Sequence, residues 1–276
     1  MTAARRTLGW AAAAALWCLA VPCAAQIVGD APPAPVPPPT TATLDFLTRY
    51  QFHLNAESIL VHDHRFSWDA DFGGEIDLLQ YENGRLTFVG NYEVILGKEL
   101  RRFDAEQGNY VLAGSLSRQT RYGELAGFLQ HVSRHLSDRP KLFGVDWNLL
   151  GARWIDVTDL GPDRRLHLES HAMLGRTVTR SYVDYTWMLA AGGTLRRPIT
   201  DRVGSFGSLD LTLVGTADPN PNRGVLKGSS LEGGVRLRGR AASVEIFARL
   251  EHRIDAEMLE RVSRSWLLLG FRFLSP

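Results

Sequence analysis

Cysteine is nearly absent from this chain of 276 residues, and its two cysteines, Cys18 and Cys23, both lie close to the N-terminus. Disulfide bonds therefore cannot stabilise the rest of the chain. An excess of one charge is also absent, because 31 basic side chains stand against 30 acidic ones and give a formal net charge of +1. This balance argues against a nucleic-acid-binding protein, which normally carries a basic surplus.

Long apolar runs are missing beyond the N-terminus. No later stretch approaches the roughly 18 consecutive apolar residues that a transmembrane helix needs, so a helical membrane protein is excluded. Hydrophobic residues nevertheless make up 45% of the chain and charged residues only 22%, which excludes wholesale disorder. The chain must therefore bury or cover its apolar side chains in some other way.

The N-terminus has the three-part layout of a secretory signal. Arg5 and Arg6 form a short positive region, and 8–21 is an apolar run that is short for a membrane span. Small residues follow, so we expect 1–25 to be a signal peptide cleaved after Ala25. A lipoprotein acylated on Cys23 is the alternative. Either reading predicts an exported protein.

The next segment, 26–42, contains six prolines between positions 31 and 39. Proline cannot donate a backbone hydrogen bond, and such a stretch is extended. We therefore expect 26–42 to be a tether and 43–276 to form the folded domain.

The body of the chain alternates apolar and polar side chains with a period of two, which predicts strands with two different faces. In 85–96, Leu86, Phe88 and Val94 share one face and Glu93 lies on the other. The same alternation occurs in 72–80, 164–174, 207–215 and 242–251. The apolar faces are rich in Leu, Phe and Gly, whereas the other faces carry both signs of charge, which suits a polar lumen.

The connections between these strands also alternate in length. Glu82-Asn83-Gly84 predicts a tight hairpin, because Asn-Gly tolerates a positive φ. Longer polar loops are expected at 97–107, 134–145 and 217–225. Short turns on one side and long loops on the other are typical of outer-membrane barrels.

These patterns predict an all-β fold, a transmembrane antiparallel up-and-down β-barrel of about 12 strands in the bacterial outer membrane. The first strand is expected at about 56–66, and an even strand number closes the sheet without edges. The last apolar face, with Phe271 and Phe273, resembles the closing strand of bacterial outer-membrane proteins. A soluble β-sandwich or a lipocalin-like barrel is the alternative. A membrane barrel would contact lipid and require the barrel-insertion machinery during assembly.

One group of polar residues could carry chemistry. In 122–133, Leu125 and Leu129 are expected to face outward and Glu124 and Gln130 inward, which places His131 and Ser133 on the outer face. If the following hairpin has its apex at Arg139-Pro140, position 131 pairs with Asn148. The expected catalytic residues are Ser133 as nucleophile, His131 as base and Asn148 as the group that fixes the histidine tautomer.

These residues carry a resemblance. His131-x-Ser133 at the end of one strand, followed on the next by Trp147-Asn148, resembles outer-membrane phospholipase A over about 25 residues, 129–154. The resemblance implies a lipid-facing serine esterase with this triad, a barrel of 12 strands, assistance by calcium and an active homodimer. Lipid A 3-O-deacylases are similar in their His-x-Ser pair.

The longer string from His131 to Asp138 also resembles a group of uncharacterised outer-membrane proteins with His-x-Ser-x-His-Leu-x-Asp. Asp138 is a candidate cation ligand, and His135 could instead shape the loop. His167 and His171 have a spacing that permits metal binding, although a hydrogen-bonded lumen network is the preferred interpretation. Non-enzymatic alternatives also stay open, namely a small-solute channel or a structural barrel.

Overall fold

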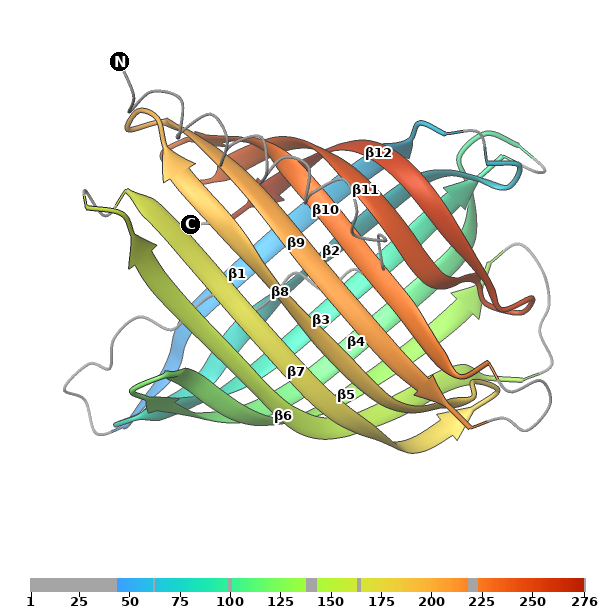
Figure 1. The fold of residues 1–276 in the computed structure, drawn as a ribbon, viewed down its shortest axis with the longest axis horizontal. Helices are drawn as coiled ribbons and strands as arrows, with labels where there is room; N and C mark the ends of the chain where they lie inside the picture. The colour runs from blue at the N-terminus through green and yellow to red at the C-terminus, as the bar shows by residue number, and fades with distance from the viewer. Residues whose placement is uncertain are drawn as a thin grey trace, which may run out of the picture.

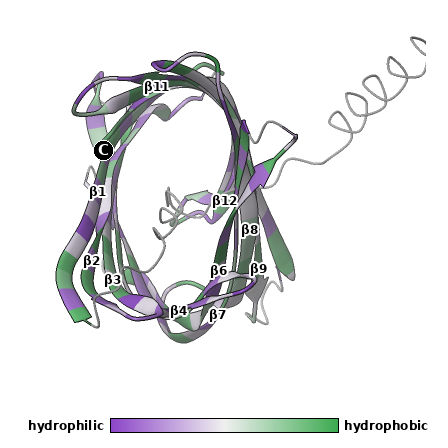
Figure 2. Cartoon of the chain, turned by 90° about the vertical axis from the view of Figure 1, so that its left-hand side faces the viewer, coloured by the Kyte–Doolittle hydropathy of each residue, from purple (hydrophilic) through white to green (hydrophobic). Residues whose placement is uncertain are grey.

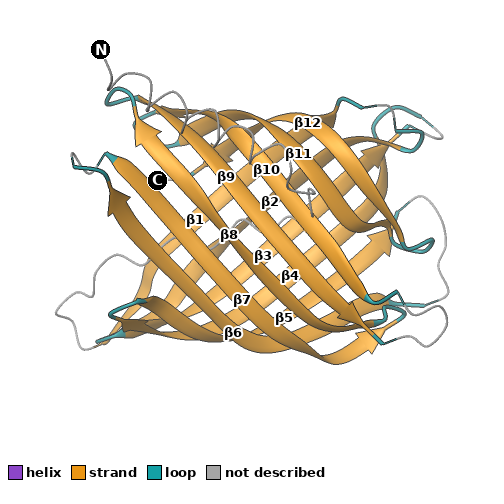
Figure 3. Ribbon diagram, viewed as in Figure 1, coloured by secondary structure: helices purple, strands orange, loops and turns teal. Residues whose placement is uncertain are grey.

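The computed structural model describes residues 44–275 apart from 62, 99–100, 138–142, 163–164 and 218–222. The expected signal peptide, the tether and Asp138 lie outside the described residues. The described chain forms twelve strands joined by turns and loops (Figure 3). In order they are β1 Leu44–Ile59, β2 Phe66–Tyr81, β3 Gly84–Gly97, β4 Asp104–Thr120, β5 Gly123–Leu136, β6 Val145–Leu160, β7 Leu166–Ser181, β8 Tyr185–Pro198, β9 Val203–Thr216, β10 Val225–Arg238, β11 Ser243–Glu257 and β12 Val262–Leu274.

The strands form one closed antiparallel barrel in which each strand pairs with its neighbours in sequence and β1 pairs with β12 (Figure 1). The predicted fold and strand number are therefore confirmed. Among the described residues no helix is long and apolar enough to cross a bilayer.

The expected position of the first strand, about 56–66, was wrong. Strand β1 begins at Leu44, and 60–65 forms the connection to β2. The reason is that outward Tyr50, Phe52 and Leu54 already alternate with polar residues before position 56, so the barrel wall continues there. The long loop expected at 97–107 is also shorter, because β4 starts at Asp104.

The hairpin at Glu82-Asn83-Gly84 forms where expected, with β2 ending at Tyr81 and β3 beginning at Gly84. No positive φ occurs in this turn. Glycine is required for another reason, because a Cβ at position 84 would lie 2.0 Å from the carbonyl oxygen of Ser117 on β4. The close approach of two backbones therefore explains Gly84.

The two ends of the barrel differ. The ends of β2, β4, β6, β8 and β10 lie on the side that holds both termini of the described chain, and the ends of β1, β3, β5, β7, β9 and β11 lie on the opposite side. The connections that leave the first side are two to five residues long, and those that leave the second side are three to eight residues long. Short turns mark the periplasmic end of an outer-membrane barrel and longer loops its extracellular end. The end of β5 at Leu136 thus lies on the extracellular side.

The outer wall is apolar. Large side chains such as Leu129, Leu150, Leu174, Leu250 and Phe273 are exposed around the whole barrel, and Figure 2 shows hydrophobic colour along the strands. So large an apolar surface is stable only when hydrocarbon solvates it, and a closed barrel leaves no unpaired sheet edge along most of its wall.

Ion pairs fill the inner face. The guanidinium of Arg253 lies 2.5 Å from Asp69, 2.9 Å from Glu93 and 2.7 Å from Glu251. Further pairs join Arg85 to Asp77 and Glu124, Arg249 to Glu57 and Glu232, Arg272 to Glu232 and Glu245, and Arg196 to Glu169 and Glu245. The polar lumen predicted from the alternation is therefore present, with its charges paired.

At the extracellular end, the last residues of β11 and the residue that follows contact strands across the barrel, and we call this segment the β11 plug (Ile254–Met258). A bulge interrupts the pairing of β11 with β12 here, and Asp255 has a φ of 47°. Arg134 of β5 donates to the Asp255 carbonyl oxygen at 2.6 Å, and Gln107 of β4 donates to that of Ala256 at 2.9 Å. The β11 plug is thus tied to strands across the barrel.

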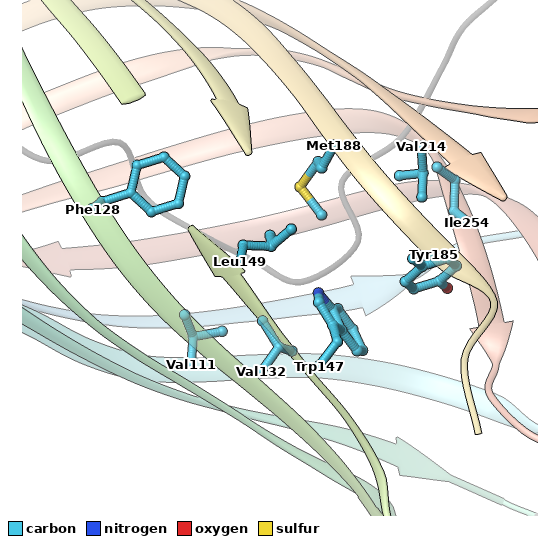
Figure 4. Close-up of a cluster of buried hydrophobic side chains, with 9 residues drawn as sticks. All are labelled: Val111, Phe128, Val132, Trp147, Leu149, Tyr185, Met188, Val214 and Ile254. Atoms are coloured by element: carbon cyan, nitrogen blue, oxygen red, sulfur yellow. The ribbon is translucent and has the colours of Figure 1, made fainter. Parts of the chain in front are cut away.

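Apolar side chains pack on the β11 plug. Ile254 belongs to a buried cluster from β4, β5, β6, β8 and β9 that includes Trp147 and Tyr185 (Figure 4). Ala256 belongs to a second buried cluster with Phe66 and others. The sequence did not predict apolar clusters inside the lumen. They arise because the bulge turns β11 residues inward against positions that otherwise would face water.

Ion pairs between loop residues join strands at the extracellular end. Arg223 of the β9–β10 loop lies 2.6 Å from Asp184 of the β7–β8 loop and 2.7 Å from Asp255. Burial alone would raise the pKa of Asp184, but the hydrogen bonds and positive charge of Arg223 outweigh it, so this pKa lies below its ordinary range. The same carboxylates raise the pKa of Arg223.

Candidate functional site

The outer face of β5 carries the predicted residues. His131 and Ser133 alternate with buried Val132, and they continue the row of exposed Leu125 and Leu129. On the inner face, Glu124 and Gln130 are buried. The predicted orientation of this strand is therefore confirmed.

The predicted register between β5 and β6 is also confirmed. His131 stands directly opposite Asn148, and Ser133 stands opposite Asp146. The ring Nδ1 of His131 lies 3.1 Å from Asn148 Oδ1. If the asparagine oxygen accepts from Nδ1–H, the other ring nitrogen, Nε2, is left unprotonated and able to act as a base.

A third strand fixes the asparagine. Its Nδ2 donates to Thr179 Oγ1 of β7 at 2.7 Å, which turns Oδ1 toward His131. This contact depends on a bulge, because the pairing of β6 with β7 skips Val178 between Thr177 and Thr179. Bulges re-aim side chains in this way, and without this one Val178 would stand opposite Asn148. Sequence reasoning missed Thr179, since nothing in the pattern marks the bulge.

The hydroxyl of Ser133 points to a different histidine. Ser133 Oγ lies 3.0 Å from Nε2 of His135, two residues further along β5. The ring of Tyr110 on β4 meets the His135 ring edge-on at a centroid distance of 5.4 Å. The serine therefore has a histidine on each side along the outer face. The second histidine of the string His-x-Ser-x-His was the signal that could have predicted this contact.

An aromatic row leads to the site across the outer wall. Phe72, Tyr92 and Tyr110 on β2, β3 and β4 have centroid distances of 5.4 Å and 4.6 Å between successive rings. Aromatic side chains favour the boundary between hydrocarbon and water. This row indicates that His135 and Ser133 lie near that boundary on the extracellular side.

The described residues do not assemble a metal site. No group of three or more His, Cys, Asp or Glu side chains that could hold a metal ion occurs in the described ranges. His167 contacts Asp159 at 2.6 Å, and His171 contacts Asp210 at 3.2 Å. Each of these histidines thus has its own carboxylate, in agreement with the hydrogen-bonded network preferred above.

Comparisons with known proteins give a likeness in fold. No protein-family model matches the chain, and no curated protein matches it. Among solved structures, Omp33 of Acinetobacter baumannii is 12% identical, with 82% of this chain and 97% of that chain covered and a TM-score of 0.40. The β domain of the Bordetella autotransporter BrkA is 15% identical, with 82% and 98% covered and a TM-score of 0.40.

The outer membrane channel DcaP of A. baumannii is 10% identical, with 82% of this chain and 95% of that chain covered and the same TM-score of 0.40. Similarities at this level carry no functional argument. The closed antiparallel wall, its apolar exterior and its paired inner charges make the chain an outer-membrane β-barrel. The resemblance to outer-membrane phospholipase A continues to rest on residues 129–154.

Proposed function

We propose that this outer-membrane barrel is a serine esterase that hydrolyses acyl esters of membrane lipids at its outer rim. Ser133 is the nucleophile, His131 the general base and Asn148 the residue that orients His131. The observation that carries the proposal is the contact of His131 Nδ1 with Asn148 Oδ1 at 3.1 Å on the lipid-facing wall. Polar side chains there are costly without a purpose, so their ordered arrangement supports a function.

The reaction would be an acyl transfer in two steps. His131 Nε2 takes the proton of the Ser133 hydroxyl while Oγ attacks the ester carbonyl, and the alcohol leaves with that proton. Water then attacks the acyl-enzyme with His131 again as the base, and the fatty acid leaves. Each step balances with water as the only other reactant.

The serine must rotate to enter this reaction, because its hydroxyl bonds to His135 in the structure. Rotation of a serine about χ1 between staggered positions is a small change. Catalytic hydrogen bonds also often tighten only when substrate is bound. His131 is the better base of the two, because Asn148 and Thr179 fix its ring, whereas His135 has an aromatic edge contact with Tyr110.

The oxyanion requires donors that the described residues do not readily provide. The backbone N–H of Ser133 lies within a strand that is paired on both sides, so the ladder already uses it. Calcium is implied by the family resemblance alone. In the described part of the chain only Asp146 places a carboxylate opposite Ser133, which does not make a calcium site, and the mechanism above uses none.

A non-enzymatic barrel is the second candidate. Its wall and lumen would have the same form, and nothing in the fold requires catalysis. A small-solute channel, however, would need an open path through the lumen. The β11 plug and the ion pairs of Arg253 oppose such a path.

Labelling of the folded protein in detergent with a fluorophosphonate tests the proposal, together with hydrolysis of long acyl esters with and without calcium. The expected result is labelling of Ser133 and loss of both signals in Ser133→Ala. The matched control is Ser265→Ala, since Ser265 also bonds a histidine, His252 Nδ1, at 2.8 Å on the outer wall. A folded barrel that hydrolyses neither phospholipid nor lipopolysaccharide would refute the esterase and leave the non-enzymatic barrel.

A further inference from the structure

An arginine faces lipid beside the candidate site. Arg176 of β7 stands opposite Leu150 of β6 and Trp187 of β8. The side chain of Leu150 is 56% exposed on the outer wall, and Arg176 shares that face and is itself exposed. The register therefore places a positive charge between two apolar neighbours on the hydrocarbon side.

No side chain among the described residues forms an ion pair with Arg176. Two arginines on the inner face, Arg253 and Arg249, have carboxylate partners. For Arg176, the structure contains neither an ion pair nor a hydrogen bond to another described residue. An arginine on the lipid face of a barrel costs about 2–4 kcal/mol at the bilayer midplane and less near the interface. An anion in the membrane would remove that cost.

Other outward cations do not share this position. Arg118, Arg197 and Lys227 each lie beside the end of their strand, where water is close. Arg176 lies further along its strand, past the bulge that brings Thr179 to Asn148. Its position is thus specific to the site rather than a general feature of the wall.

The distance between Arg176 and His131 fits one lipid molecule that reaches from Arg176 to the candidate site. Arg176 is two strands from His131 and two residues along, which corresponds to about 12 Å between the Cα atoms from ordinary strand dimensions. The long arginine side chain shortens the gap that a ligand must span. Guanidinium binds phosphate with two parallel hydrogen bonds, and phosphate is the anion that lipids carry next to their ester groups.

We propose that Arg176 binds the phosphate of a membrane lipid headgroup and thereby holds the lipid's ester groups at Ser133. The inference rests on the proposed esterase for the fate of the lipid, but the binding itself requires no turnover. The substrate class is then a phosphate-bearing acyl lipid, not a neutral glyceride. Arg176 acts as a specificity residue, since it does not touch the reacting atoms.

Binding is tested without hydrolysis in the full-length Ser133→Ala protein. The probes are phosphatidylglycerol and diacylglycerol with identical acyl chains, and their retention by the detergent-purified barrel is measured by native mass spectrometry. We expect the phosphate lipid to be retained about ten-fold better than diacylglycerol. The added change Arg176→Gln should remove this preference, and Arg176→Lys should keep part of it.

Lys227→Gln is the matched control, because Lys227 is another exposed outward cation on the extracellular half of the wall. It should leave the preference unchanged. An equal loss in Lys227→Gln would show general attraction of anionic lipid and overturn the proposal, as would retention of the preference in Arg176→Gln.

Hydrolysis is measured separately with Ser133 intact. Retention that depends on Arg176 in a protein without hydrolysis would keep the phosphate site and refute the esterase. Hydrolysis of phosphate-bearing and neutral esters with the same KM in the wild type and in Arg176→Gln would keep the esterase and refute the phosphate site.

Discussion

The two faces of the β5–β6 hairpin use polar side chains differently. On the inner face, Arg134 is fully buried and bound to the β11 plug, and Glu124 is paired with Arg85. On the outer face, His131 and Ser133 are only partly covered, and each contacts a single polar side chain. Buried polar side chains thus join strands across the inner face, whereas the partly covered side chains of the outer face stay accessible to a ligand.

The largest expected effect tests the outer face. Ser133→Ala and His131→Ala should each lower kcat for ester hydrolysis by a factor on the order of 10³ or more, because each removes one half of the nucleophile pair. The free energy of unfolding should stay within about 0.5 kcal/mol of the wild type, as is usual for exposed positions. Initial rates and urea unfolding in detergent measure the two quantities. If His131→Ala hydrolyses esters at the wild-type rate and His135→Ala loses most of that rate, the base is His135.

The next effect tests the inner face. Arg253→Met removes the cation shared by Asp69, Glu93 and Glu251 and leaves buried carboxylates unpaired. We expect a loss of about 3–5 kcal/mol in the free energy of unfolding. The midpoint of urea unfolding measures it, with Arg118→Met at an exposed strand end as the control. A stability equal to that of the wild type would mean that the inner charges do not hold the barrel together.

A smaller effect tests the bulge on β7. Thr179→Val removes the hydroxyl that fixes Asn148 and should cost about 1 kcal/mol, or about a five-fold drop in kcat. Val178→Ala is the neighbouring control, because Val178 makes no hydrogen bond to Asn148 through its side chain. If Asn148→Ala lowers kcat strongly while Thr179→Val leaves it unchanged, the orientation of the amide does not depend on β7.

The smallest expected effect is a loss of stability at low pH through Asp184. The pKa of Asp184 is depressed in the folded state, whereas an unfolded aspartate has a pKa of about 3.9. Its stabilising contribution is therefore fully present above the unfolded pKa and is lost as pH falls through the folded one. The difference in unfolding free energy between wild type and Asp184→Asn should be constant from pH 7 to pH 5 and shrink below about pH 4. Urea unfolding across this range measures it, and a difference that grows toward low pH would contradict the sign.

The sequence predicted much of the site because β-structure has simple geometry. A period of two assigns each side chain to a face, so His131 and Ser133 could be placed outward with Leu129. One hairpin apex then determines every pair, which gave His131 opposite Asn148. The catalytic roles of Ser133, His131 and Asn148 stay predictions.

Irregular places could not be predicted in the same way. A bulge shifts all the pairs beyond it, by one residue at Thr179 and by two between Arg253 and Glu257. The residue pattern around Thr179 and Asp255 does not predict either bulge. The hydroxyl of Ser133 contacts His135 and not His131, and this depends on the serine rotamer, for which strand periodicity gives no information.

By itself, the sequence determined the strands of the wall: the alternation of apolar and polar residues gives each strand one apolar face and one charged face. Only the tertiary structure decided which distant groups meet, such as Arg134 with the β11 plug and Arg176 with the edge of the candidate site. The physical reason is that alternation is a local property of each strand, whereas contacts across the lumen and along the wall depend on register, bulges and closure of the whole barrel.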